Sequence, residues 1–228
     1  MKAKFGAVIV GGSGKIGGHV VTKNRAGYAL RTKVTPSNPQ SSSQSVVRNR
    51  LTGIAQAWAG LTEAQRTAWN GAVSSFQKTN IFGDKVTPSG FNLYQKLNNN
   101  LLAVGSAMID TPPSPGEVQA LTALSVVADN SSNTLIATFS PAIDAGTDFK
   151  ILATESYNAG KSFVKNKFRV IGTGTSANTS PYDISTLYQA KFGAIGATGK
   201  KIAVQFVGVN NVTGQMGIPI QAICTIQS

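Results

Sequence analysis

The residues most suggestive of chemistry form a glycine-rich run near the N-terminus, within the sequence VIVGGSGKIGGHVV. An apolar segment followed by Gly11, Gly14 and Gly17 has the spacing of a turn whose backbone amides bind a dinucleotide pyrophosphate. That turn works only when a helix follows the glycines and an acidic residue, about 20 positions further on, binds the ribose hydroxyl.

Neither requirement is met in this chain. The residues after the glycines, TKNRAGY, are few, charged and interrupted by Gly27, and the first acidic residue is Glu63. The glycine run is not a P-loop either, because Gly14 and Lys15 are followed by Ile16 and not by Ser or Thr. We therefore expect no cofactor and interpret the glycines as turn positions with positive φ. A nicotinamide-dependent dehydrogenase is the least favoured of three functional hypotheses.

Other catalytic or metal-binding sets are scarce. The chain has one His, His19, and one Cys, Cys224, which excludes an internal disulfide, a multi-histidine metal site and a cysteine-based zinc site. No sequence context positions a Ser–His–Asp triad, and the segment with Asp144 and Asp148 is typical of a solvated turn. We expect no catalytic residue, no metal ligand and no enzymatic activity. Cys224 is expected to be a buried thiol in the last strand.

Positive charge is concentrated at the N-terminus. The 228 residues include 21 Lys and Arg against 9 Asp and Glu, a net charge of +12, and residues 1–50 contain no acid. Self-repulsion opposes compaction of such a segment unless a negative partner neutralises it. The predicted contacts to an acidic protein or to nucleic acid are the basic residues of this segment: Lys2, Lys4, Lys15, Lys23, Arg25, Arg31, Lys33, Arg48 and Arg50.

Most of these charges lie on residues 1–41, which we predict to be an extended basic arm. The segment is rich in Gly, Ser and basic residues and has few apolar residues from which to build a core. Pro36 and Pro39 bias their neighbours away from helix. The arm is expected to become ordered by lying along a partner.

Residues 42–110 are predicted to form a small helical module. Helices are expected over residues 44–59, over residues 63–77, and from Ser89 through Leu101. The sequence TEAQ at 62–65 is a capping box that begins the second helix. The apolar positions of the first helix, expected to face a core, are Val47, Leu51, Ile54 and Trp58. Trp58 and Trp69 are the expected packing anchors.

After a Pro-rich linker at 111–117 the chain changes character. Residues 118–228 contain short β-rich runs separated by turn-forming clusters, at 121–128, 134–139, 149–154, 167–171, 201–209 and 218–226. This pattern predicts an immunoglobulin-like or fibronectin type III-like β-sandwich, with one short helix over 183–192. The predicted fold class is α+β: an extended basic arm, a helical module and a C-terminal sandwich.

Several motifs are spread over most of the chain. They are GKIGG at 14–18, KNRAG at 23–27, PSNPQ at 36–40, WAGLTEAQRTAW at 58–69, SGFNLY at 89–94, KFG at 191–193 and VNNVTGQ at 209–215. Together they resemble a family of tailed-bacteriophage and prophage virion structural proteins. The resemblance implies a virion component without catalysis.

The leading functional hypothesis is therefore a non-enzymatic structural component of a phage virion, either a capsid auxiliary (decoration) protein or a head–tail junction component. Its expected partners are capsid, portal or tail subunits, with many copies in a symmetric assembly, and its expected location is the virion after synthesis in the host cytoplasm. The alternative is a nucleic-acid-binding protein that uses the basic arm on phosphates. No membrane contact is expected, since no apolar stretch approaches about 20 residues.

Overall fold

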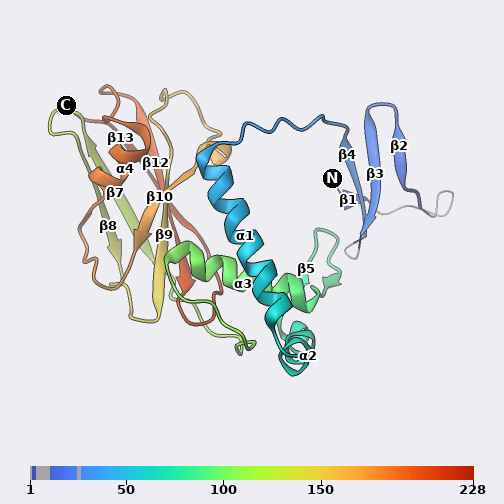
Figure 1. The fold of residues 1–228 in the computed structure, drawn as a ribbon. Helices are drawn as coiled ribbons and strands as arrows, with labels where there is room; N and C mark the ends of the chain where they lie inside the picture. The colour runs from blue at the N-terminus through green and yellow to red at the C-terminus, as the bar shows by residue number, and fades with distance from the viewer. Residues whose placement is uncertain (1, 4–10, 25–26) are drawn as a thin grey trace.

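The computed structural model describes residues 2–3, 11–24 and 27–228. Among these residues the chain has a mixed α and β fold with four α-helices and several antiparallel sheets (Figure 1). The helices are α1 (Ser42–Gly60), α2 (Glu63–Ala72), α3 (Gly90–Val104) and α4 (Ser185–Phe192), with 3-10 turns η1 (Val73–Phe76) and η2 (Lys165–Lys167). The strands are β1 (Lys2–Ala3), β2 (Gly14–Ile16), β3 (His19–Asn24), β4 (Gly27–Thr32), β5 (Lys78–Thr79), β6 (Lys85–Val86), β7 (Ala123–Asp129), β8 (Thr134–Ser140), β9 (Thr147–Ala153), β10 (Arg169–Gly174), β11 (Tyr182–Asp183), β12 (Lys201–Asn210) and β13 (Ile220–Thr225).

Strands β1 to β4 form an antiparallel sheet in the order β1-β4-β3-β2. We call residues 14–32 the N-terminal meander. Gly17 (φ +53°) lies in the turn between β2 and β3, and Gly27 (φ +102°) begins β4; glycine adopts both backbone conformations without steric cost. In Figure 1 the meander stands at the opposite end of the molecule from the large sheets of the C-terminal half.

The expected extended arm is thus wrong in its local structure, because the glycine turns let residues 14–32 pair with one another. The glycine run leads into the β2–β3 hairpin, and the strand–turn–helix arrangement of a dinucleotide site is absent from the described part of this segment. The expected lack of a core agrees with the burial, since none of the described residues between 11 and 41 is buried.

Helices α1, α2 and α3 form the helical segment, and their ends follow the sequence signals. The Thr62 hydroxyl accepts a hydrogen bond from the Gln65 amide, and the Gln65 side chain accepts one from the Thr62 amide, which completes the predicted capping box. The Ser89 hydroxyl caps α3 by accepting from the Asn92 amide. The second predicted helix divides into α2 and the 3-10 turn η1.

An aromatic cluster forms the core of the helical segment. Tyr94 of α3 is fully buried between Trp58 and Trp69, with ring centroids 5.2 Å from each. The Trp69 indole N–H donates to the Asp110 carbonyl oxygen at 2.8 Å. Both tryptophans therefore act as the expected packing anchors.

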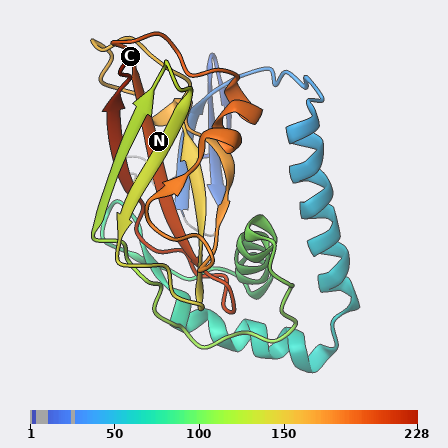
Figure 2. The same ribbon diagram turned by 90° about the vertical axis from the view of Figure 1, so that its left-hand side faces the viewer.

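The first half of α1 is less covered than its apolar spacing suggests. Ile54 is fully buried and Trp58 packs on α3, whereas Val47 and Leu51 keep 58 % and 49 % of their surface exposed. The expectation that Val47 and Leu51 face a core is therefore wrong, since α1 diverges from α3 toward its N-terminus (Figure 2).

Two further antiparallel sheets make up the C-terminal half, in the orders β10-β9-β12-β13 and β11-β8-β7. Their inward side chains share one core, in which Phe206 lies 5.7 Å from Phe139 and 6.3 Å from Phe149 between ring centroids. The sheets meet along one side, where the Gln227 amide donates to the Ala128 carbonyl oxygen. Cys224 is buried in this core, as predicted.

The Pro-rich segment at 111–117 lies against the loop between β12 and β13, so it is not the free tether that its composition suggests. The Gly116 amide donates to Gln215 Oε1 at 2.6 Å, and Asn210 Nδ2 donates to the Glu117 carbonyl oxygen at 3.2 Å. Helix α3 contacts the same loop, because the buried Asn100 Nδ2 donates to the Gly214 carbonyl oxygen at 2.8 Å. The helical segment and the two sheets are therefore packed together.

Candidate functional site: a basic cleft beside helix α1

A cleft of about 790 Å³ lies between the first half of α1, helix α3 and the sheet that contains β9 and β10. Figure 2 shows α1 running along one side of the molecule, apart from this sheet. Twelve residues line the cleft: Ser41, Ser43, Val46, Val47, Arg50, Asn99, Ala103, Lys150, Arg169, Val170, Lys191 and Phe192. We call this the basic cleft, because four of these residues are cationic and none is acidic.

Each cation comes from a different element. Arg50 lies on α1, and Lys191 lies in the last turn of α4. Lys150 lies on β9 between two core residues, so the alternation of the strand turns its side chain outward toward the cleft. Arg169 begins β10, where its guanidinium donates to the carbonyl oxygens of residues 166 and 168.

The electrostatics of the cleft follow from this convergence. Partial burial, and then the nearby Arg50, lower the pKa of the Lys150 ammonium from its ordinary value. Like charges held close together destabilise one another, and a bound anion relieves that repulsion. The arrangement can therefore bind a carboxylate or phosphate group.

The basic cleft also has an apolar component. Val46, Val47 and Val170 are 56 %, 58 % and 48 % exposed, and all three line the cleft. Aliphatic side chains next to cations suit a ligand that presents both acidic and apolar groups. An extended peptide segment has this combination, because its successive side chains can differ in character.

The predicted contact residues divide between two places. The N-terminal meander contains Lys15, Lys23 and Arg31, and Lys33 directly follows it. Lys2 lies in β1, whereas Lys4 and Arg25 fall outside the described residues. The register places Lys15 and Arg31 on either side of Val20 in one row across three strands. Lys23 lies on the opposite face, with its amino group 5.4 Å from the Tyr28 ring centroid.

The two remaining predicted residues lie on α1 and have different roles. Arg48 Nη2 donates to Asn38 Oδ1 at 2.7 Å, which connects α1 to the segment that precedes it. Arg50 is half-buried and is the predicted residue that lines the basic cleft.

Sequence reasoning missed the other three cations of the cleft, Lys150, Arg169 and Lys191. They are far from Arg50 in the sequence, in a half of the chain whose charges nearly balance. The one local signal is Lys150, a lysine within the apolar run of β9, which had to lie on the outward face of its strand.

Within residues 11–24 and 27–228 no group of three or more His, Cys, Asp or Glu could hold a metal ion. His19 is exposed on β3. No helix among the described residues has the length and apolar character needed to cross a membrane.

Comparison with known proteins adds little. No protein-family model matches the chain, and no curated protein matches it either. A solved structure, an Fn3-like protein from Clostridium thermocellum, is 21 % identical to this chain with a TM-score of 0.32. The match covers 50 % of this chain and 97 % of that protein.

Proposed function

We propose that this protein is a non-enzymatic structural component of a bacteriophage virion, either a capsid auxiliary protein or a head–tail junction component. The observation that carries the proposal is the N-terminal meander, which pairs its backbone without burying any described side chain. A small sheet that lacks a buried face is marginal by itself in water. It therefore suits a protein whose N-terminal segment is stabilised by contact with a neighbour in an assembly.

The C-terminal half has a matching role in this proposal. We assign its two sheets to an immunoglobulin-like or fibronectin type III-like sandwich, an architecture that serves as a rigid support for exposed loops. The helical segment packs against the loop between β12 and β13 through Asn100 and Gly214, so the helices and the sandwich would hold fixed positions relative to one another.

The basic cleft supplies a docking place for the partner. Its four cations and exposed valines suit an acidic segment of a neighbouring virion protein that also carries apolar side chains. Many copies in a symmetric assembly would multiply a contact of this kind through effective concentration.

The proposal is tested in purified particles. We expect the protein to be present in gradient-purified virions by mass spectrometry, and its absence would refute the proposal. The Arg50→Glu/Lys150→Glu double variant should enter particles at least tenfold less than the wild type. The matched control is Lys85→Glu/Lys161→Glu, which makes the same change of charge at two exposed lysines that do not line the cleft and should enter normally.

Nucleic-acid binding is the second candidate, since phosphates would also satisfy the cations of the cleft. If the four cations each neutralised one phosphate of duplex DNA, the logarithm of the binding constant would fall with the logarithm of salt concentration with a slope of about −3.6. Binding by the isolated protein with this slope, abolished in the Arg50→Glu/Lys150→Glu variant, would support this candidate. Absent or salt-insensitive DNA binding would eliminate it.

A further inference from the structure

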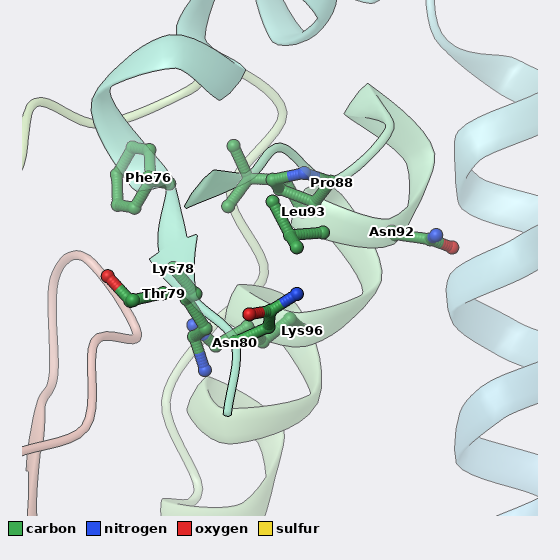
Figure 3. Close-up of a pocket in the computed structure, with 9 residues that line it drawn as sticks. Phe76, Lys78, Thr79, Asn80, Pro88, Asn92, Leu93 and Lys96 are labelled. Carbon is green, nitrogen blue, oxygen red and sulfur yellow. The ribbon is translucent and has the colours of Figure 1, made fainter. Parts of the chain in front are cut away.

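A second pocket, unrelated to the basic cleft, lies between helix α3 and the short hairpin of β5 and β6 (Figure 3). Its volume is about 360 Å³, within the range of about 300–1,000 Å³ that small-molecule sites occupy. One part of its lining, which we call the apolar wall, consists of Phe76, Val86, Pro88 and Leu93. Leu93 and Phe76 belong to the core of the helical segment, so the wall is held by a packed scaffold.

The polar part of the lining consists of Lys78, Thr79, Asn80, Asn92 and Lys96, and we call its two lysines the amino end. These two lysines come from β5 and α3, and both line the pocket. Partial desolvation, and then the charge and hydrogen bond of Lys78, lower the pKa of Lys96 to about 8. Two amines that converge beside apolar side chains repel each other, and a single anion between them accepts hydrogen bonds from both.

The acidic residue of the hairpin is already engaged elsewhere. Asp84 Oδ2 accepts from the Asn80 side-chain amide at 3.1 Å, and Asn80 Oδ1 accepts from the backbone amides of Phe82 and Asp84. These bonds fix the turn between β5 and β6 and hold Asn80 at the edge of the pocket. Among the charged groups, Lys78 lowers the pKa of Lys96. An external anion bound between the two lysines would offset their repulsion.

We propose that this pocket binds a carboxylate attached to an apolar body, with the carboxylate at the amino end and the apolar body on the apolar wall. A carboxylate fits better than a phosphate ester of a polar molecule, because most of the pocket surface opposite the amines is apolar. The ligand is either a free small acid or the C-terminal residue of a peptide that ends in an apolar side chain. This site is independent of the proposed function, since it requires no assembly.

The test uses the full chain and titration by NMR spectroscopy. The free-acid probe is 4-phenylbutyrate, and the peptide probe is N-acetyl-Gly-Gly-Phe with a free C-terminus. Each is compared with its uncharged counterpart, 4-phenylbutanol or the peptide amide. We expect at least one acid to bind, with chemical-shift changes confined to α3, η1 and the β5–β6 hairpin, and its uncharged counterpart to bind at least tenfold more weakly. The tighter of the two acids identifies the source of the ligand.

Lysine substitutions distinguish binding in this pocket from nonspecific attraction of an acid to a basic protein. Lys96→Met should weaken binding of the acid at least tenfold while the circular dichroism spectrum stays unchanged. Lys161→Met is the matched control, because a neighbouring lysine, Lys167, also lowers the pKa of Lys161, whereas Lys161 is fully exposed. Its affinity should stay within twofold of the wild type. Failure of both acids to bind, or equal loss of binding in the two variants, would overturn the proposal.

Discussion

Replacing Gly214 with alanine should test whether the helical segment and the C-terminal sheets are one packed unit. Gly214 has a φ of +71°, and a Cβ built there would lie 2.3 Å from the Leu97 carbonyl oxygen and 3.1 Å from the Leu101 side chain. The left-handed conformation costs a non-glycine residue about 1–2 kcal/mol. Relief of the clash by shifting α3 adds about 1–3 kcal/mol, as for overpacked cores. We expect the free energy of unfolding to fall by about 2–5 kcal/mol.

The assay is equilibrium unfolding in guanidinium chloride, followed by circular dichroism and by tryptophan fluorescence. Because both tryptophans lie in the helical segment, a mismatch between the two curves would show that this segment had uncoupled from the sheets. Gly199→Ala is the matched control, since Gly199 has a similar φ of +83° and open space around a built Cβ. That variant should lose only about 1–2 kcal/mol. If Gly214→Ala costs no more than Gly199→Ala, the packing argument is refuted.

Three further predictions concern buried or clustered polar groups. The Tyr94 hydroxyl is buried with no hydrogen-bond partner among the described residues, so Tyr94→Phe should leave the free energy of unfolding unchanged or raise it by about 1 kcal/mol in denaturant unfolding. Asp148 is buried in β9, so the solvated turn expected for it is wrong; this burial raises the pKa of its carboxyl against the opposing hydrogen bond of Asn211, and the folded state therefore loses stability as pH rises above about 4. Asp148→Asn should therefore stabilise the protein more at pH 7 than at pH 4, and equal effects at the two pH values would contradict this reasoning. Arg50→Gln should raise the pKa of Lys150 toward its ordinary value, measured by NMR titration of the lysine side chain; an unchanged pKa would show that the two groups do not interact.

Local signals predicted the regular elements well. The Thr62 capping box, the Ser89 cap and the alternation in the C-terminal half each involve residues close in sequence, and each element lies within a few residues of its predicted place. Strand alternation also predicted the burial of Cys224. These features depend on short-range hydrogen bonds and side-chain periodicity, which the sequence displays directly.

The features that were missed depend on contacts between distant residues. Helical spacing placed Val47 and Leu51 on the apolar side of α1, but whether that side is covered depends on the direction in which α1 leaves α3. The basic cleft joins Arg50 to cations about 100 or more residues away, and only the packing of four elements brings them together. The composition of residues 1–41 correctly indicated the lack of buried side chains at 11–24 and 27–41, where burial is described, but did not reveal that the strands of this segment pair.

The length of the connector between β4 and α1, residues 33–41, limits the distance between the meander and the rest of the chain. An extended residue spans at most about 3.3–3.6 Å, so this connector can separate the two parts by about 30 Å. In an assembly whose neighbouring sites lie closer than that distance, each copy could place its meander on the next copy. Such an exchange would join the copies in series around a ring or across a shell, and residues 42–228 would keep their fold unchanged.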